Sequence, residues 1–459
     1  MPDLMPLQRY LTEHRQQFED DLCELLRIPS VSADRNYAGD VRRAADWVAG
    51  RLRRLGLASE VIETDGNPLV YAESPPVPGA PTVLVYGHYD VQPADPLDQW
   101  TSPPFEPTVR DGNLYARGAT DDKGQMLTHV NSVQAWIETA GQLPLQVKFL
   151  IEGEEEVGSE SLNKFLERSA DKLACNVVVV SDTAQFAPGQ PAITYGLRGI
   201  AYFELRLTGP KHDLHSGTFG GGVTNPANAL ARMLAALVDN DGRVQVPGFY
   251  DDVIPLTDRE RAQFAALAFD EQAFMERIGV DGLTGEVGYT NLERRWARPT
   301  CDINGIWGGY QGEGGKTVLP SKAGAKFSFR LVPRQDPHRV AAGLRELLSP
   351  ICPPGIKLEL IEMHGAPGAL VSLDSPYMQA AARAIELGFE RPPVFIREGG
   401  SIPIVTAFYE RLGVDTLLLG WGLDDDNAHG PNEKFSLADF HRGIRASAYL
   451  WQELAGQGI

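Results

Sequence analysis

The sequence predicts an α/β protein with a mostly parallel sheet flanked by helices, into which an α+β domain is inserted. Continuous apolar runs without period-2 alternation occur early and late in the chain, and such runs suit strands buried on both faces of a parallel sheet. Amphipathic helical stripes alternate with these runs. From about residue 200 the pattern changes to alternating strands, which indicates a second domain.

The first part of the chain contains three predicted helices, each with one apolar face. Their apolar residues recur at helical spacing, and a glycine closes the second and third stretches. The helical stretches are 18–26, 41–55 before Gly56, and 126–137 before Gly141. The buried strands predicted between and after them are 83–86, 147–151, 177–180 and 417–419.

The inserted domain begins with alternation of apolar and polar residues over 201–207, as in a half-buried antiparallel strand. A helix with Leu230 and Met233, a polar segment of irregular pattern over 240–300, a strand over 326–331 and a helix over 340–348 follow. Helical and buried-strand patterns then return, ending in a helix over 437–444. The expected boundaries are 1–198 and 375–459 for the first domain and 199–374 for the inserted one.

Composition excludes several classes of function. Lys and Arg total 42 and Asp and Glu total 61, so the net charge of −19 repels phosphate backbones, and nucleic acid is not an expected partner. The N-terminus lacks the pattern of a secretory signal, and no apolar run approaches a membrane span, so we expect a cytoplasmic protein without a membrane contact. Four separated cysteines without Cys-x-x-Cys leave His and carboxylates as the expected metal ligands.

Candidate metal ligands follow the predicted buried strands, where ligands bind in open α/β sheets. Each piece has a structural explanation: a hydrogen-bonded turn, a helix N-cap or a solvated acidic face. These structural explanations would have to hold independently at each strand end. The convergence of so many imidazole and carboxylate side chains on one sheet edge therefore favours a metal site. The residues are His88 and Asp90, Asp121 and Asp122 before a helix, the run 154–156, Asp182, and His429.

Two rival motifs fail. Residues 308–317 resemble a phosphate-binding loop, but Tyr310 stands where that motif requires glycine, and Pro320 opposes the helix that should follow. No Gly-x-Ser-x-Gly follows a buried strand, so a serine nucleophile elbow is not predicted.

Five segments together resemble the co-catalytic metallopeptidase family of carnosine dipeptidases and cytosolic nonspecific dipeptidases. Its wider relatives include acetylornithine deacetylases and succinyl-diaminopimelate desuccinylases. The segments, which span nearly the whole chain, are 87–93, 117–124, 152–159, 212–217 and 428–434, with 195–199 and 397–403 resembling the dipeptidase branch. The resemblance implies a catalytic domain and an inserted lid and dimerisation domain.

The resemblance also implies roles for the candidate ligands. One metal would be bound by His88 and Asp182, the other by Glu156 and His429, with Asp121 bridging the two and a cis peptide after Asp121. Glu155 would be the general base. Glu154 leaves a register ambiguity, which the following Val157-Gly158-Ser159 resolves in favour of 155–156. Asp90 would orient the His88 ring.

The inserted domain would supply the substrate contacts. In the family the residue matching Arg330 binds the substrate carboxylate, with Thr317 and Ser401 near the same end. The residue matching His215, rather than His212, enters the active site of the neighbouring subunit and donates to the oxyanion, which implies a homodimer.

The expected activity is hydrolysis of the amide bond of dipeptides or similarly short substrates with a free carboxylate. Two divalent ions per subunit, Zn²⁺ or Mn²⁺ with Co²⁺ also suitable, would activate a shared water, and Glu155 would move its proton. Alternatives are an N-acyl amino-acid amidase and a noncatalytic metal-binding or interaction protein. The presence of Glu155 counts against the last, because a scaffold without chemistry needs no unliganded base.

Overall fold

The computed structural model describes residues 4–400 and 402–458, which form two compact units. The first contains residues up to 195 together with 371–396 and 407–459, and the second contains 196–370 and 397–406. The second unit is therefore built mainly from one continuous stretch inside the sequence of the first. Each unit is described by itself below.

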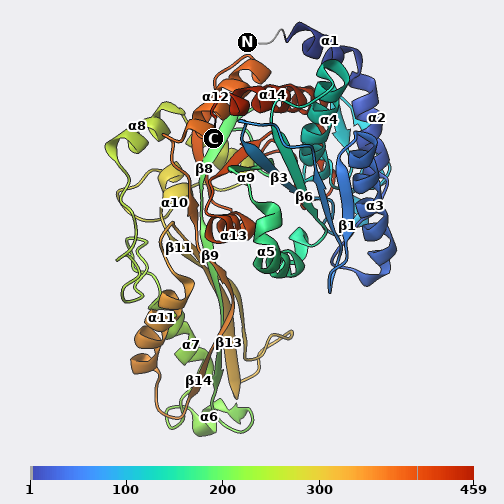
Figure 1. Ribbon diagram of the computed structural model, residues 1–459. Helices are drawn as coiled ribbons and strands as arrows, with labels where there is room; N and C mark the ends of the chain where they lie inside the picture. The colour runs from blue at the N-terminus through green and yellow to red at the C-terminus, as the bar shows by residue number, and fades with distance from the viewer. Residues whose placement is uncertain (1–3, 401, 459) are drawn as a thin grey trace. The chain divides into compact units, whose positions relative to one another are not determined.

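The first unit is an α/β layer structure (Figure 1). Its helices are α1 (Met5–Glu13), α2 (Arg15–Leu26), α3 (Ala38–Arg54), α4 (Lys123–Ala140), α5 (Glu160–Leu173), α12 (Pro376–Phe389), α13 (Pro403–Leu412, whose first turn belongs to the second unit) and α14 (Leu437–Ala455). Its strands are β1 (Ala58–Ile62), β2 (Leu69–Glu73), β3 (Thr82–His88), β4 (Thr108–Arg110), β5 (Asn113–Tyr115), β6 (Gln146–Glu152), β7 (Val177–Val180), β8 (Ala192–Leu197), β16 (Val394–Glu398), β17 (Thr416–Gly420) and β18 (Lys434–Ser436).

The main sheet has the strand order β1-β2-β6-β3-β7-β17-β8-β15, where β15 is Ala369–Leu370. The four central strands, β6, β3, β7 and β17, run parallel, and the neighbours on both flanks are antiparallel. These four strands are the apolar runs of the sequence, and almost all of their residues are buried. The predicted α/β fold with a parallel sheet is confirmed at its centre, and antiparallel strands extend it on each side.

Helices cover the central strands as the amphipathic stripes predict. Helix α14 packs against both α12 and α4 (Figure 1). The α4 helix ends at Gly141, whose φ of 75° is the left-handed conformation that glycine adopts without a Cβ clash. Within residues 4–400 and 402–458, no helix combines the length and the apolar character needed to span a membrane.

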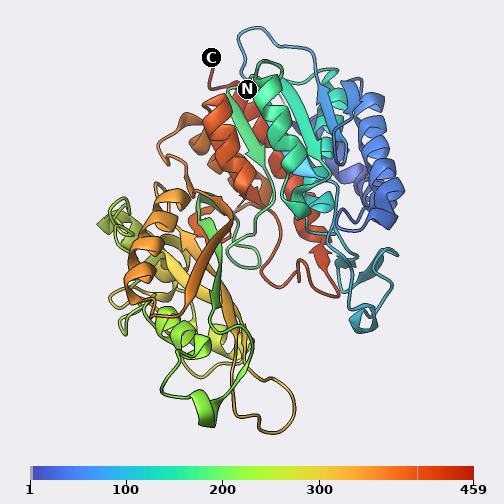
Figure 2. The same ribbon diagram turned by 90° about the horizontal axis from the view of Figure 1, so that it is seen from below.

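The second unit is centred on a four-stranded antiparallel sheet of order β11-β13-β9-β14. Phenylalanine and aliphatic side chains of β9 and β13 form a core with helices α7 and α11, drawn in green and orange in Figure 2. The elements are β9 (Gly199–Thr208), β10 (Leu214–His215), α6 (Ser216–Phe219), α7 (Pro226–Ala235), α8 (Asp258–Ala266), α9 (Glu271–Ile278), α10 (Asn291–Ala297), β11 (Thr300–Gly308), β12 (Val318–Leu319), β13 (Lys322–Leu331), α11 (Pro337–Ile351) and β14 (Lys357–Ala366).

Candidate active site

The carboxyl ends of the parallel strands bring the predicted ligands together in the first unit. His88 ends β3 and lies opposite Glu152, the last residue of β6, so the run 154–156 begins at the same edge. Asp182 follows β7, the other neighbour of β3. The parallel register therefore places side chains from three separate segments beside one another, as the strand-end argument predicts.

Asp121 lies between two imidazoles. Its Oδ1 is 3.1 Å from His88 Nε2 and its Oδ2 is 2.9 Å from His429 Nε2. His429 Nε2 is also 3.4 Å from Glu156 Oε2. One carboxylate thus presents a different oxygen to each histidine, which is the arrangement that a bridging ligand needs.

Two groups of potential ligands share Asp121. One contains His88, Asp121 and Asp182, and the other contains Asp121, Glu156 and His429, with ligand atoms within 4.8 Å of one another in each group. Imidazole and carboxylate donors of this kind suit Zn²⁺, Mn²⁺ and Co²⁺. The predicted set of five ligands therefore lies in one place, divided as two ions with a shared carboxylate require.

The electrostatics of the cluster also fit divalent cations. Burial, followed by the charge of Asp121, raises the pKa of Glu156 to about 8. Burial and the charges of Asp121 and Asp122 raise the pKa of Asp182 well above its usual range. Several carboxylates crowded in a buried site repel one another, and bound cations remove that repulsion.

Asp90 contacts the His88 ring through both its backbone oxygen and its carboxylate. His88 Nδ1 is 3.0 Å from the backbone oxygen of Asp90 and 3.4 Å from its Oδ1. The two carboxylate oxygens of Asp90 accept hydrogen bonds from the backbone N–H groups of Glu155, at 3.3 Å, and Glu156, at 3.2 Å. Asp90 therefore connects the His88 ring to the turn that carries Glu155 and Glu156.

The three consecutive glutamates have different surroundings. Glu154 is buried, and its carboxylate accepts hydrogen bonds from the backbone N–H groups of Asn67, at 2.7 Å, and Ser161, at 3.0 Å. Neither ligand group found among the described residues includes Glu155, and burial raises the pKa of its carboxyl group. Glu156 is a member of the second group. A partly buried carboxyl group with a raised pKa beside the candidate ligands, such as that of Glu155, has the properties of a proton-transfer group.

The loop before α4 is fixed by Glu433, whose role the sequence argument missed. Glu433 Oε1 accepts from the N–H groups of Thr120, at 3.0 Å, and Asp121, at 3.1 Å, while Oε2 accepts from Gly118 N–H at 2.9 Å and from Arg117 Nη1 at 2.7 Å. The Asp121–Asp122 peptide is cis, as the resemblance implies. The only sequence signal for Glu433 was its place in the segment 428–434.

The remaining candidates belong to the second unit or lie outside the described residues. His215 in β10 pairs with Val318 of β12, and Ser216 N–H donates to the backbone oxygen of Thr317, so His215 and Thr317 are neighbours. The Nδ1 atom of the exposed His215 accepts from Gly217 N–H at 3.1 Å. Arg330 lies on β13 opposite Ile200 and Thr300. Ser401 lies outside the described residues.

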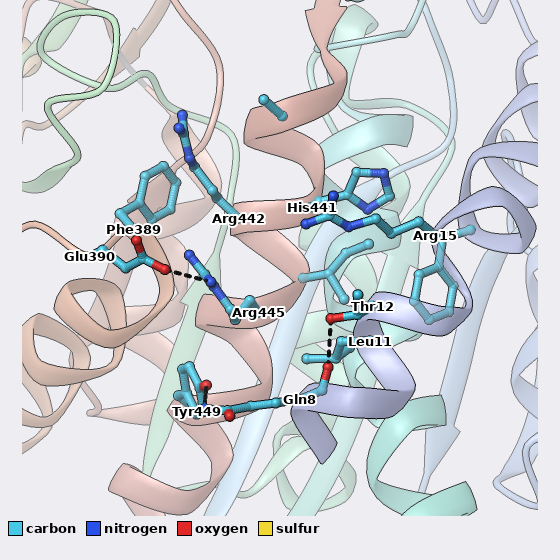
Figure 3. Close-up of a pocket in the computed structure, with 13 residues that line it drawn as sticks. Gln8, Leu11, Thr12, Arg15, Phe389, Glu390, His441, Arg442, Arg445 and Tyr449 are labelled. Atoms are coloured by element: carbon cyan, nitrogen blue, oxygen red, sulfur yellow. Dashed lines mark hydrogen bonds and ion pairs between the residues drawn. The ribbon is translucent and has the colours of Figure 1, made fainter. Parts of the chain in front are cut away.

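A separate cavity of about 550 Å³ lies in the first unit between α1, α2 and α14 (Figure 3). None of the predicted site residues lines it. Two of its arginines have acidic partners, since Arg445 bonds Glu390 and Arg442 bonds Asp439, and His441 contacts Glu19, which lies outside the lining. The cavity therefore lacks the convergent ligands of the Asp121 cluster.

Comparison with known proteins agrees with this geometry. Residues 84–453 match Peptidase family M20/M25/M40. The chain is 34% identical to the Cys-Gly metallodipeptidase dug1 of Schizosaccharomyces pombe, covering 98% of each chain, and 34% identical to the Beta-Ala-His dipeptidase of Homo sapiens, covering 97% of this chain and 92% of the relative.

A solved structure of the dipeptidase Dug1p from Saccharomyces cerevisiae is similar over 99% of each chain, with 30% identity and a TM-score of 0.84. Both the matched range and the coverage include the whole ligand cluster of the first unit and the sheet of the second. The chain belongs to Peptidase family M20/M25/M40.

Proposed function

We propose that this protein is a two-metal dipeptidase that hydrolyses dipeptides or similarly short substrates with a free carboxylate. The observation that carries the proposal is the position of Asp121, which offers one oxygen to the His88 group and the other to the His429 group. The names of the relatives, a Cys-Gly metallodipeptidase and a Beta-Ala-His dipeptidase, support dipeptides as the substrate class.

The ligand groups would hold Zn²⁺ or Mn²⁺, and Co²⁺ also suits their nitrogen and oxygen donors. Such a pair supplies a Lewis acid for the scissile carbonyl and a water that is nucleophilic near neutral pH. Glu155 would take a proton from the attacking water and give one to the leaving amine, a role for which its raised pKa is suited. Asp90 keeps Glu155 in place through the backbone N–H.

His215 acts as the oxyanion donor in the active site of the partner subunit of a homodimer. Its Nδ1 accepts a hydrogen bond from Gly217, so the proton of the neutral ring is on Nε2, and this N–H is available as a donor. The test mixes His215→Ala with Glu155→Gln protein under conditions that let subunits exchange. Hybrid dimers should regain part of the activity, and failure to regain it despite demonstrated exchange contradicts the role in the partner site.

Arg330 binds the substrate carboxylate in this proposal, with Thr317 and Ser401 as further contacts. A guanidinium offers two parallel donors that match the two oxygens of a carboxylate. The four cysteines, all free, support a reducing compartment such as the cytoplasm as the place of action.

One experiment separates the proposal from its two alternatives. The metal-loaded protein is assayed on dipeptides, including Cys-Gly and β-Ala-His, and on N-acyl amino acids. Faster hydrolysis of dipeptides supports the proposal, faster hydrolysis of N-acyl amino acids favours the amidase, and activity on neither favours a noncatalytic protein. The partly buried Glu155, which belongs to neither ligand group, favours the two catalytic possibilities.

A further inference from the structure

A buried ion pair joins α8, in the polar segment 240–300, to the end of β16. Arg397 Nη2 donates to Glu260 Oε1, and the two side chains are 6% and 14% exposed. The stem of Arg397 lies over Gly196, where an added Cβ would be 3.0 Å from Cγ and Cδ of the arginine. Both charges are therefore largely removed from water, and loss of either partner removes a charge-assisted contact from the other.

The other oxygen of Glu260 is fixed by its own helix. Glu260 Oε2 accepts from Thr257 N–H and Thr257 Oγ1, each at 3.0 Å, and Thr257 Oγ1 accepts from Glu260 N–H at 3.2 Å. This reciprocal capping box orients the carboxylate before Arg397 approaches it. Helix α8 therefore offers Arg397 a rigid partner.

A second contact fixes the residues that follow Arg397. Arg198 Nε donates to the backbone oxygen of Gly399 at 3.2 Å, and Arg198 N–H donates to that of Glu398 at 3.2 Å. Arg198 Nη1 lies 3.5 Å from the backbone oxygen of Arg298, the C-cap of α10. A Cβ at Gly399 would lie 2.8 Å from Arg198 Nη2 and 3.0 Å from Arg295 O, so glycine permits this close approach.

Arg198, which contacts Gly399, also lies near Arg330, the residue proposed to bind the substrate carboxylate. Arg330 of β13 lies opposite Ile200, and Arg198 directly precedes β9, two residues before Ile200. Burial and the charge of Arg330 lower the pKa of Arg198 to about 10. All of these residues belong to the second unit.

We propose that the segment 240–300 positions the segment Arg397–Gly400, and that Glu260 is the positioning residue. The inference rests on the proposed function, in which Arg330 and Ser401, the residue that follows the segment, bind the substrate. Glu260 holds Arg397, and α10 together with Arg198 holds Gly399. The metal ligands and Glu155 are in the other unit, so loosening this segment weakens substrate binding more than the chemical step.

The test uses Glu260→Gln, which removes the charge while glutamine still completes the capping box. The KM of a free-acid dipeptide should rise about tenfold, with kcat changed less than about threefold. The Glu260→Gln/Arg397→Gln double variant should be no worse than the more affected single variant, because the two side chains act as one pair. Glu271→Gln, the same change on the neighbouring helix α9, should match the wild type.

Amide hydrogen exchange of the substrate-free protein gives a readout independent of turnover. Glu260→Gln should speed exchange in a peptide containing Glu398–Gly400 and leave the loop 117–121 unchanged. Gly399→Ala, which crowds Arg198, should do the same, whereas Gly400→Ala should not, because an added Cβ there meets nothing within 4 Å.

The outcomes are separable. An unchanged KM with normal wild-type turnover overturns the positioning role, and so does a raised KM without faster exchange in the 398–400 peptide. A wild-type protein that hydrolyses no dipeptide instead contradicts the proposed function.

Discussion

Glu433→Gln tests how the Asp121 loop is held. The carboxylate of Glu433 accepts four hydrogen bonds, two on each oxygen, from Arg117, Gly118, Thr120 and Asp121. A carboxamide has one oxygen, so in either orientation its NH₂ group faces two donors and two of the four bonds are lost. The side chains of Glu433 and Arg117 are 0% and 1% exposed, so the remaining guanidinium charge is buried.

The magnitude follows from these contacts. Hydrogen bonds to charged groups contribute about 1.5–3 kcal/mol each, and breaking a buried ion pair costs about 3–5 kcal/mol, so we expect unfolding stability to fall by about 3–5 kcal/mol. Because Asp121 N–H is one of the donors, we expect the Asp121 carboxylate to shift as well. Loss of a hydrogen-bond partner that orients a metal ligand typically lowers metal affinity about 10–100-fold.

The assay titrates metal-free protein with Zn²⁺ in competition with a chelating dye and measures urea unfolding on the same samples. Asp425→Asn is the matched control, since its side chain is 63% exposed and pairs with Lys434, the neighbour of Glu433. Asp425→Asn should lower the free energy of unfolding by less than about 1 kcal/mol and leave metal affinity unchanged. Wild-type metal affinity in Glu433→Gln would refute the reasoning that Glu433 positions Asp121.

Three further predictions follow from the same structure. Glu155→Gln should retain its metal and lose about 10²–10⁴-fold in turnover, and near-normal turnover would assign the base to another residue. Arg330→Ala should impair free-acid dipeptides more than C-terminally amidated ones, and equal losses on both speak against the carboxylate contact. Burial lowers the pKa of His129 to about 3 in the folded protein. In the unfolded chain this histidine binds a proton below its ordinary pKa of about 6.5, whereas in the folded protein it stays neutral. The free energy of unfolding therefore falls as the pH decreases from about 6.5 towards 3. In metal-free protein, His129→Gln should remove about 1.4 kcal/mol of the stability lost between about pH 7.5 and 5.5, and an unchanged pH dependence contradicts this.

The central strands and the strand-end ligands were predictable because both have local signatures. Buried parallel strands are continuous apolar runs, and the candidate ligands lie at or within a few residues of the ends of β3, β6 and β7. The antiparallel flanks were not predicted: β1 has exposed and half-exposed residues, and β2 and β8, although buried, were not among the apolar runs identified in the sequence. The division of Glu154, Glu155 and Glu156 among different roles came from the family resemblance, since three adjacent glutamates look alike in a sequence.

Contacts between distant residues were beyond the sequence argument. Glu433 bonds Arg117 across 316 positions, and Glu260 bonds Arg397 across 137. A buried carboxylate that faces backbone N–H groups has no periodic pattern around it, so only the fold reveals its partners. The polar pattern over 240–300 likewise gave no sign that short capped helices there contact Arg397 and Gly399.

The most direct test of a two-metal dipeptidase is the metal content at which activity saturates. Metal-free protein is loaded stepwise with Zn²⁺ or Mn²⁺, and bound metal per chain and hydrolysis of a free-acid dipeptide are measured on each sample. Because Asp121 is shared by two ligand groups, activity should reach its maximum only as the second ion per chain binds. Full activity with one tightly bound ion per chain would contradict the two-metal account.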